Sequence, residues 1–458
     1  MERKQAQRQM DGDEAVHHPS RNTRKRICMI AYSNYELDNR VRRYAETLAS
    51  RGDDVHVISL STDQFRSPLE DFHGVTVHRV QHRNFDERSK WSYAGPLLRF
   101  LWRSSRTLSR LHRQNRFDLI HVHNMPDFLV FSAWYPKLTG AKIILDIHDI
   151  VPELFQSKFK TSLASGYVSL LKMIEWLSVR FADHIIVSNH LWRDTLIGRS
   201  LSKEKCSVFV NHVDPKIFFR HARTRKDDRI IILFPGSFQW HQGLDIAMEA
   251  FAKVRIQVPS AEFHLYGPGD ESEAELKRLA SHLSLGESVK FFEKVVLDRI
   301  ADVMANADLG VVPKRANSFG NEAYSTKIME FMSQGVPVVA SRTKIDTYYF
   351  SDDVVEFFPS GDSDAMAEAM LKVINNRERR DQLIARGYDY AERNGWDLKQ
   401  QEYTGLVDAL CAGQTHREQT DSHNGQLPID AHGHKDDICG GESVQDLPRM
   451  ASRKAATD

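Results

Sequence analysis

Cysteine is scarce in this 458-residue sequence, and the four that occur lie far apart. Cys28, Cys206, Cys411 and Cys439 form none of the short pairs that bind zinc or carry out thiol exchange. Four cysteines in so long a chain are also too few for a disulfide framework. We therefore expect a protein of a reducing, cytoplasmic compartment.

Net charge and long apolar runs are absent as well. The 62 Lys and Arg residues balance 62 Asp and Glu residues, so there is no general electrostatic attraction to nucleic acid. No run approaches the roughly 18–20 apolar residues that span a bilayer. The first residues, MERKQAQRQMDGDE, do not contain the apolar core of a secretory signal. A protein that is soluble or attached to a membrane surface is expected.

The chain is too long for one ordinary core, and strand patterns alternate with helix patterns along it. We expect an α/β protein with two Rossmann-like domains, at residues 25–212 and 229–395, joined by a charged linker at 213–228. A helix at 396–411 is expected to return to the first domain. The polar segments 1–24 and 412–458 are expected to be disordered.

Apolar runs predict the strands of the two domains. In the first half these lie at residues 26–32, 54–60, 117–123, 141–149, 182–188 and 207–214. In the second half they lie at residues 229–237, 261–269, 288–294, 307–313 and 336–341. Ligands bind at the C-terminal ends of the strands in such sheets, so the two domains predict a site between them.

The segment NEAYSTKIMEFMSQGVPVVAS contains the strongest chemical pattern. Ser325 or Thr326 can cap a helix, which places Glu322 in the preceding loop and Glu330 in the helix. The positive end of that helix, with Lys327 in its first turn, is suited to a pyrophosphate group. Judged by spacing alone, a surface helix with two solvated glutamates explains the pattern equally well.

This segment resembles the E-x7-E signature of the group 1, or family 4, retaining glycosyltransferases, which have the GT-B fold. FPGSFQWHQGLD resembles their glycine loop, EFHLYGPG the next strand and glycine turn, and VMANADLGVVP the segment before the signature. FDLIHVHNMPD and ILDIHDIVPE resemble their histidine-bearing strand ends, and NHVDPKIF resembles the entry to the linker. The resemblance implies a metal-independent enzyme without a cofactor. It would transfer a sugar from a nucleoside diphosphate sugar held by the second domain to an acceptor held by the first.

The resemblance also implies individual roles. Glu330 would accept hydrogen bonds from the donor ribose, Glu322 would help to place the anomeric carbon, and His148 would lie near the reacting sugar and the β-phosphate. The other donor contacts would come from the glycine loop, the main chain at residues 293–296 and the start of the signature helix: Gly236, Ser237, Gln242, Val295, Tyr324, Ser325, Thr326 and Lys327.

The glycine loop departs from the family pattern. Many members have Arg and Lys where this chain has Ser237 and Gln242, so two cations are missing. Lys327 and the helix dipole would then carry more of the positive charge, together with Arg315 or His241. The missing cations leave open a catalytically silent nucleotide-sugar-binding subunit, and the shared fold leaves open a nucleotide-sugar epimerase.

Histidines at the strand ends of the first half are further candidates. We favour His148 as a functional residue, with Asp149 to orient it. His121 and His123 are expected to point to opposite faces of their strand, which would make them poor joint metal ligands. His123 is a candidate for the acceptor side.

The loop SNYELDNR, after the first strand, lacks the paired glycines of many relatives. Asn39 and Arg40 are its candidates for the acceptor side. A helix that begins at Asp38 or Asn39, followed by a solvated arginine, explains the same residues.

The stretch at residues 80–116 is basic and contains Trp91, Phe100 and Trp102. A basic amphipathic helix of this composition can lie on an anionic membrane. We therefore predict peripheral contact with the cytosolic face of a membrane and a lipid-linked acceptor, as in polysaccharide biosynthesis. A core-packed helix with a basic solvent face is the alternative.

Overall fold

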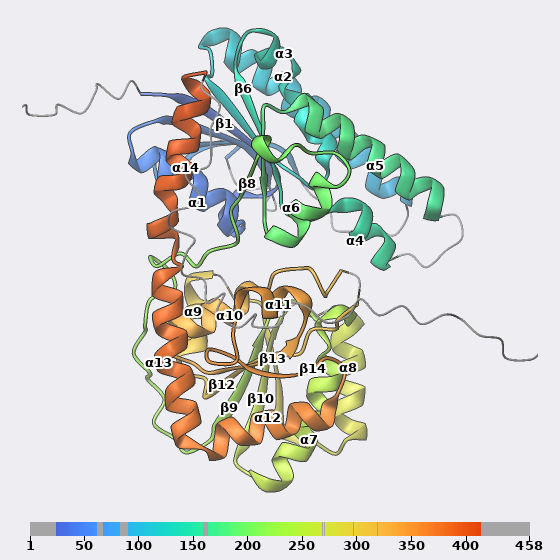
Figure 1. Ribbon diagram of the computed structural model, residues 1–458, viewed down its shortest axis with the longest axis vertical. Helices are drawn as coiled ribbons and strands as arrows, with labels where there is room; N and C mark the ends of the chain where they lie inside the picture. The colour runs from blue at the N-terminus through green and yellow to red at the C-terminus, as the bar shows by residue number, and fades with distance from the viewer. Residues whose placement is uncertain are drawn as a thin grey trace, which may run out of the picture. The chain divides into compact units, whose positions relative to one another are not determined.

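The computed structural model describes residues 24–61, 67–82, 90–158, 164–267, 269, 271–295, 297–317 and 319–413, without the side chains of residues 90–93 and a few others beside the gaps. These residues belong to one compact unit, which contains two sheets (Figure 1). The terminal segments expected to be disordered lie almost entirely outside the described residues. Across the described ranges, no helix is long and apolar enough to cross a membrane.

The first sheet has eight strands in the order β3-β4-β2-β1-β5-β6-β7-β8, and all neighbours are parallel except β3 and β4. Five of its predicted strands are confirmed, whereas the hairpin of β3 and β4 was not predicted because β3 is short and polar. The strands are β1 (Arg26–Asn34), β2 (Asp54–Ser61), β3 (Leu69–Phe72), β4 (Val75–His82), β5 (Leu119–His123), β6 (Lys142–Ile147), β7 (His184–Val187) and β8 (Cys206–Val208).

Helices cover both faces of this sheet because its strands are buried on both sides. α1 (Asn39–Ser50) and α14 (Trp396–Cys411) pack on one face, around Met29, Val57 and Tyr403. The other face packs around Ile30 and Phe100. It is covered by α2 (Lys90–Gln114), the 3-10 helix η2 (Asp127–Ala133), α3 (Trp134–Leu138), α5 (Ala164–Phe181) and α6 (His190–Ile197), while α4 (Val151–Lys158) packs against α5.

The second sheet is parallel throughout, in the order β11-β10-β9-β12-β13-β14. This is the doubly wound order, and the chain reverses direction across the sheet between β9 and β12. The glycine loop follows β9 at this reversal point, where such sheets bind ligands. The strands are β9 (Ile230–Pro235), β10 (Ala261–Gly267), β11 (Val289–Glu293), β12 (Leu309–Val312), β13 (Val338–Arg342) and β14 (Glu356–Pro359).

Helices also cover both faces of the second sheet. One face packs around Phe234 and Phe251, under α7 (Leu244–Gln257), α8 (Glu271–His282) and α12 (Ser363–Asn375). The other packs around Ile328 and Phe331, under α9 (Leu297–Ala305), α10 (Thr326–Ser333), α11 (Lys344–Tyr349) and α13 (Arg377–Arg393). The remaining short 3-10 helices are η1 (Tyr35–Leu37), η3 (Lys203–Lys205), η4 (Trp240–Gln242) and η5 (Gly286–Ser288).

Strand β14 was not predicted, and two further segments differ from the sequence prediction. The strand predicted at residues 207–214 is reduced to β8, since the carbonyls of Phe209 and His212 accept hydrogen bonds from arginines of α1 instead of a neighbouring strand. The basic stretch at residues 80–116 is not one helix, because residues 80–82 complete β4 and α2 begins at Lys90.

Candidate functional site

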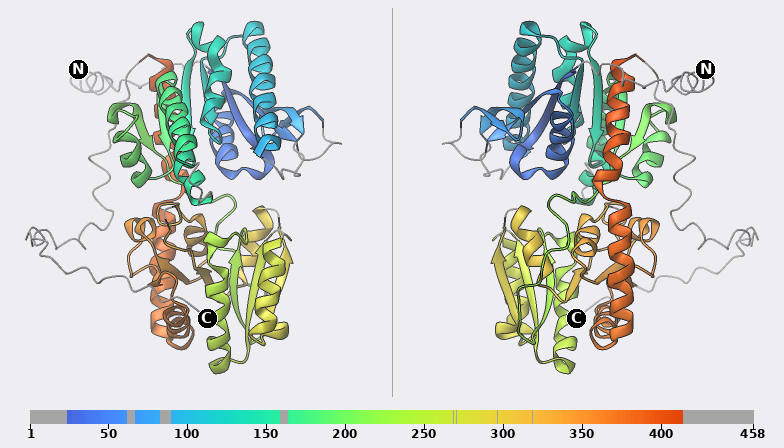
Figure 2. Two further views of the ribbon diagram at one scale, coloured as in Figure 1. Left: turned by 90° about the vertical axis from the view of Figure 1, so that its right-hand side faces the viewer. Right: turned by 90° about the vertical axis from the view of Figure 1, so that its left-hand side faces the viewer.

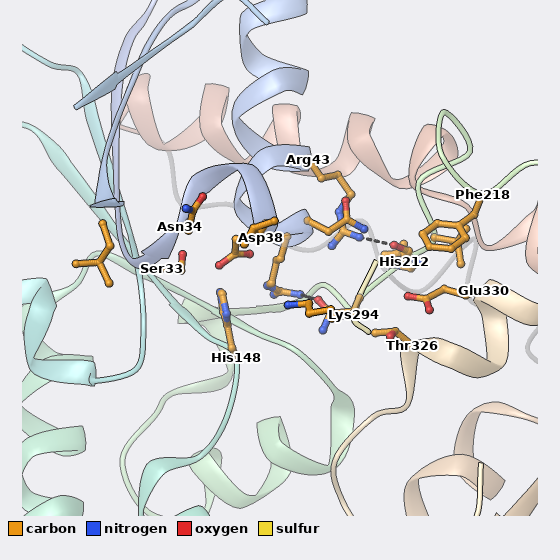
Figure 3. A pocket seen from close by; sticks show the side chains of 16 residues that line it. Ser33, Asn34, Asp38, Arg43, His148, His212, Phe218, Lys294, Thr326 and Glu330 are labelled. Carbon is orange, nitrogen blue, oxygen red and sulfur yellow. Dashed lines mark hydrogen bonds between the residues drawn. The ribbon is translucent and has the colours of Figure 1, made fainter. Parts of the chain in front are cut away.

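A cavity of about 460 Å³ opens at the C-terminal end of β1 and extends to the start of α10 (Figure 3). Its volume is within the ~300–1,000 Å³ usual for small-molecule sites. The side chains that line it are those of Ser33, Asn34, Leu37, Asp38, Asn39, Arg40, Arg43, Leu60, His148, Asn211, His212, Val213, Phe218, Lys294, Thr326 and Glu330. It thus brings together five of the residues proposed from sequence: Asn39, Arg40, His148, Thr326 and Glu330.

The loop after β1 is shaped by local capping. Asn34 Oδ1 accepts a hydrogen bond from the Glu36 amide, and Asp38 Oδ1 accepts one from the Val41 amide at 3.2 Å. Asp38 is therefore the N-cap of α1, as its position in the sequence predicted. This cap places Asn39, the first residue of α1, on the wall of the cavity.

Arg40 is buried, in contrast to the solvated arginine considered from sequence. Its Nε and Nη2 atoms donate to the two oxygens of Asp146 at 2.8 and 2.7 Å. Its Nη1 atom donates to the Phe209 carbonyl and to Asn211 Oδ1, both at 2.8 Å. Burial alone would raise the pKa of the Asp146 carboxyl, but the Arg40 guanidinium holds it well below its usual range. Arg40 therefore connects β6 with the chain after β8, and its contact with an acceptor stays a prediction.

His148 and His123 meet at the same carboxylate. His148 Nε2 and His123 Nδ1 each lie 3.1 Å from Asp146 Oδ2 and 3.1 Å from each other. The carboxylate placed to orient His148 is thus Asp146, whereas the sequence had suggested Asp149. His123 is 1% exposed and does not line the cavity, so its assignment to the acceptor side stays a prediction.

The expected orientation of His121 and His123 was wrong. Their rings stack with centroids 4.3 Å apart. Side chains alternate along a strand, so residues two apart point to the same face and not to opposite faces. Burial keeps the pKa of both imidazoles below its usual value.

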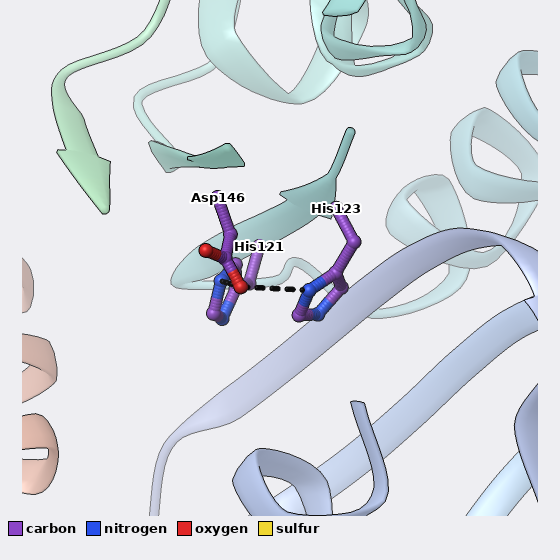
Figure 4. Close-up of side chains that lie close together, drawn as sticks. All are labelled: His121, His123 and Asp146. Atoms are coloured by element: carbon purple, nitrogen blue, oxygen red, sulfur yellow. Dashed lines mark hydrogen bonds and ion pairs between the residues drawn. The ribbon is translucent and has the colours of Figure 1, made fainter. Parts of the chain in front are cut away.

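His121, His123 and Asp146 bring possible metal-ligand atoms within 4.8 Å of one another (Figure 4). Both oxygens of Asp146 are already paired with Arg40, and His121 Nδ1 lies 2.9 Å from the hydroxyl of Tyr403. A divalent cation on Asp146 would meet the guanidinium charge at close range in a buried site, where repulsion is strong. The donor set therefore fits an ion-pair network better than a cation site.

Sequence reasoning did not propose Arg43 and His212, which also line the cavity, and it proposed only the main chain of Lys294, within residues 293–296. Arg43 is 3% exposed, donates to the His212 carbonyl and lies 4.8 Å from the ring centroid of Trp396. Within the described structure its Nε and Nη2 atoms have no hydrogen-bond partner. Burial lowers the pKa of Arg43 to about 10. Its position one helical turn after Arg40, on the same face of α1, was the available signal.

α10 begins at Thr326, and Ser325 is its N-cap residue, as the sequence predicted. Within the described structure, the Ser325 side chain makes no capping hydrogen bond. The backbone amides in the first turn of α10 can therefore bind an anion. Lys327 extends from this turn until its Nζ atom lies 3.3 Å from Gln242 Oε1. Burial lowers the pKa of Lys327 to about 8, although Glu330 acts in the opposite direction.

Two glycines allow the glycine loop to pack closely. A Cβ atom on Gly236 would lie 2.7 Å from Lys327 Cε, so glycine leaves room for the lysine. Gly243 has a φ of 68°, and a Cβ atom there would lie 2.0 Å from the Pro313 carbonyl oxygen. The loop after β9 therefore approaches the loop after β12 and keeps Ser237 and Gln242 beside the start of α10.

The two signature glutamates lie in the predicted loop and helix. Glu330, in α10, lines the cavity, and burial raises the pKa of its carboxyl against the effect of Lys327. Glu322 lies outside the group of described residues that line the cavity. Its Oε1 atom is 3.6 Å from Lys344 Nζ, and its carbonyl accepts a hydrogen bond from Asn189 Nδ2 at 3.1 Å.

Two of the donor residues proposed from sequence, Tyr324 and Val295, do not line the cavity. The hydroxyl of Tyr324 points to Met329 Sδ at 3.0 Å, which leaves its main chain for donor contacts. Val295 follows β11 beside Lys294, and Val296 lies outside the described residues.

Comparisons with known proteins agree with this architecture. Residues 37–212 match the family model described as glycosyl transferase 4-like domain, and residues 216–390 match that of glycosyl transferases group 1. A phosphatidyl-myo-inositol mannosyltransferase of Mycobacterium leprae is 24% identical over 388 residues, covering 81% of this chain and 94% of the relative. A D-inositol 3-phosphate glycosyltransferase of Stackebrandtia nassauensis is 24% identical over 378 residues, covering 78% and 82%.

Solved structures show the same fold. Sucrose-phosphate synthase from Thermosynechococcus elongatus superposes with a TM-score of 0.71 at 19% identity, covering 85% of this chain and 100% of that chain. HepE of Anabaena, in complex with UDP-glucose, superposes with a TM-score of 0.64 at 16% identity, covering 84% and 99%. The chain is a glycosyltransferase with the GT-B fold and belongs to group 1, or family 4, of these enzymes.

Proposed function

We propose that this glycosyltransferase moves a sugar from a nucleoside diphosphate sugar to a saccharide or lipid-linked saccharide, with retention at the anomeric carbon and without a metal ion. One observation carries the proposal. A single cavity is lined by Thr326 and Glu330 at the start of α10 and by His148 and the loop after β1 (Figure 3). A donor bound at α10 would present its anomeric carbon to an acceptor held beside that loop.

The start of α10 supports the choice of donor. The uncapped first turn and the ammonium of Lys327 suit a diphosphate, and Glu330 suits the hydroxyls of a ribose. HepE, which has this fold, was solved with UDP-glucose bound. Titration calorimetry with several nucleoside diphosphates would test the donor class, and binding of none of them would contradict it.

Retention is proposed through displacement on one face of the sugar. The bond from the anomeric carbon to the β-phosphate oxygen breaks, the bond to the acceptor oxygen forms on the same face, and the acceptor proton passes to the leaving diphosphate. His148 would hydrogen-bond the reacting groups, and Asp146 is the residue that positions it. The anomeric configuration of the first-formed product, measured by NMR, tests this step, and an inverted product would exclude it.

Independence of metal is proposed because the protein itself supplies positive charge to the leaving diphosphate. Lys327, the helix terminus and Lys294, which lines the cavity, are the sources. Turnover should persist in EDTA. Loss of turnover in EDTA, with recovery on addition of a divalent ion, would show that a metal is required.

The two signature glutamates separate donor binding from turnover. Glu330→Ala should weaken nucleotide binding, whereas Glu322→Gln should keep the affinity and lose most of the turnover. Full activity in Glu322→Ala would contradict the role assigned to Glu322 in turnover. Nucleotide release measured with and without an acceptor separates transfer from epimerase activity and from a silent subunit.

The acceptor is proposed to be lipid-linked and to be reached at the cytosolic face of a membrane. Trp102 and several arginines are exposed on α2 and support a membrane position, and one relative is named for a phosphatidyl-myo-inositol. Transfer to lipid-linked saccharides in vesicles should exceed transfer to the same saccharides in solution. Equal rates for the two forms would contradict a lipid-linked acceptor.

A further inference from the structure

Helix α5 presents an apolar stripe to solvent. Tyr167, Leu170, Met173, Trp176 and Leu177 are between 43% and 54% exposed. Their spacing of three or four residues places them along one side of the helix. Single exposed apolar residues are ordinary, but a stripe of five large side chains on one helix marks a surface that binds something.

The apolar surface extends across two neighbouring helices. α2 exposes Leu98 and Trp102 by 58% and 62%, and α3 exposes Trp134 and Leu138 by 49% and 77%. The indole nitrogen of Trp134 donates to Ser105 Oγ at 3.1 Å, which joins α3 to α2. Trp102 and Ser105 are one turn apart in α2, so the two tryptophans lie close together.

α3 and η2 also contact α5. The ammonium of Lys137, in α3, lies 5.3 Å from the ring centroid of Phe181, and the rings of Phe131 and Phe181 have centroids 5.2 Å apart. The left view of Figure 2 shows α5 in green and α2 in blue, with the teal η2 and α3 segment between them. We name the exposed residues of α2, α3 and α5 the outer face.

The outer face carries charge of one sign. Arg106 lies 5.8 Å from the ring centroid of Trp102, and Arg180 lies 5.3 Å from that of Trp176. In the described parts of α2, η2, α3 and α5, the acidic residues are Asp127 and Glu175, and both are buried. The exposed basic residues are Arg99, Arg106, Arg110, Arg113, Lys172 and Arg180.

Only part of this face follows the prediction made for residues 80–116. Phe100 is fully buried in the core, and Arg103 donates to the Val80 carbonyl at 3.0 Å, so neither faces outward. Helix α2 is therefore packed on its inner side and carries both basic and apolar side chains on its outer side. α5 was not part of that prediction, because its 18 residues contain few charges and are typical of a core helix.

We propose that the outer face binds the surface of an anionic lipid bilayer. Tryptophan and tyrosine side chains favour the interface between headgroups and acyl chains, and arginines favour anionic headgroups. A second copy fits less well, since a symmetric contact would bring the same basic residues against themselves. The proposal deepens that of a lipid-linked acceptor, but membrane binding can be measured without any sugar transfer.

Vesicle co-sedimentation of the full chain tests the proposal. The protein should bind vesicles that contain phosphatidylglycerol, bind phosphatidylcholine vesicles at least tenfold more weakly, and lose affinity in 0.5 M NaCl, where surface charges are screened. The triple variants Leu170→Ser/Met173→Ser/Trp176→Ser and Arg99→Glu/Arg106→Glu/Arg110→Glu should each bind anionic vesicles at least tenfold more weakly than the wild type.

A matched control removes exposed apolar residues elsewhere. Ile256 and Leu398 are 81% and 55% exposed, on α7 and α14, and Ile256→Ser/Leu398→Ser should bind vesicles within twofold of the wild type. Unchanged melting temperatures would show that the outer-face variants remain folded, which is expected because the substituted side chains are exposed.

Several outcomes overturn the proposal. These are equal binding to both kinds of vesicle, no binding to either, and outer-face variants that bind like the wild type. If light scattering shows a dimer that the α5 variant makes monomeric, with no vesicle binding, the occupant is a second copy. Intact vesicle binding without transfer to a lipid-linked saccharide would contradict the proposed acceptor and leave the membrane surface standing.

Discussion

Replacing Asp146 with Asn should destabilise the protein strongly, because the Asp146–Arg40 pair is withdrawn from water. Asp146 is fully buried, Arg40 is 5% exposed, and two hydrogen bonds of 2.7 and 2.8 Å join them. In the Asp146→Asn variant the guanidinium keeps only neutral acceptors, the Phe209 carbonyl and the Asn211 amide oxygen. Its charge would then be buried without a counter-charge.

Removal of one partner of a buried pair costs about 3–5 kcal/mol of unfolding free energy. For a domain of this size, each kcal/mol corresponds to roughly 2–4 °C in melting temperature, so a fall of about 6–20 °C is expected. Differential scanning calorimetry measures this fall. Asp381→Asn is the control, since Asp381 pairs with Arg377 at 3.5 Å on the surface, and it should leave the melting temperature nearly unchanged.

Arg40→Met should behave differently with pH. The Arg40→Met variant leaves the Asp146 carboxylate buried, with its Oδ2 atom 3.1 Å from His123 Nδ1. In the wild type, burial lowers the pKa of His123. Without the guanidinium, the carboxylate should raise the pKa of His123 above the unfolded value of about 6.5. Protonation of His123 then adds stability to the variant. This stability is fully present below the unfolded pKa of about 6.5 and is lost as the pH rises through the pKa of His123 in the folded variant. The destabilisation by Arg40→Met should therefore be smaller at pH 5.5 than at pH 8.

A double-mutant cycle completes the test. The variant Arg40→Met/Asp146→Asn buries no charge at this position and should be more stable than the sum of the single losses predicts. A coupling energy near zero, or a loss of less than about 1 kcal/mol in Asp146→Asn, would refute the reasoning that the pair is desolvated and unscreened.

Three further predictions concern the donor side. Lys327→Met should weaken binding of a nucleoside diphosphate on the order of 10–100-fold, as expected for one charged hydrogen bond, and titration calorimetry would show a smaller loss if other cations carry the diphosphate. Adding Gln242→Lys to that variant should restore much of the affinity, because the Lys327 ammonium lies 3.3 Å from the Gln242 oxygen; no recovery would argue against a shared position. Gly243→Ala should lower the melting temperature more than Gly361→Ala. Both glycines have positive φ, but only at Gly243 would the new Cβ atom meet the backbone, at the Pro313 carbonyl oxygen. Equal falls in melting temperature would contradict the close packing at Gly243.

Local signals predicted the parts of the site that depend on neighbouring residues. The cap at Asp38, the start of α10 at Thr326 and the loop and helix positions of the two glutamates follow from residue types only a few positions apart. Most of the parallel strands followed from apolar runs, whereas β4 and β14 were not predicted. These features are fixed by short-range geometry, which a sequence displays directly.

Contacts between distant segments were beyond the sequence. Arg40 and Asp146 are 106 positions apart, and the Arg43 contact with His212 spans 169. Arg40 does not differ from a solvated arginine in its local pattern, and the only signal for Arg43 was its position one helical turn after Arg40. The error over His121 was of another kind, because a correct use of the two-residue repeat would have placed it beside His123.

The charge of the glycine loop shows how sequence position and spatial position can differ. By its resemblance to the family, the loop was expected to be short of two cations at Ser237 and Gln242, but Lys327 reaches Gln242 through the space that Gly236 leaves open. Of the two other candidates from sequence, Arg315 is paired with Asp245, and His241 Nε2 lies 3.0 Å from Gln242 Nε2.

A partly buried lysine differs chemically from an arginine in the same position. An arginine stays charged at any working pH, whereas burial lowers the pKa of Lys327 to about 8. A diphosphate binds the protonated ammonium, so donor affinity should be constant below pH 8 and fall by up to tenfold per pH unit above it. Lys327→Arg should remove this fall. If the wild type and Lys327→Arg show the same pH profile between pH 7 and 9.5, then Lys327 is not the cation that holds the diphosphate.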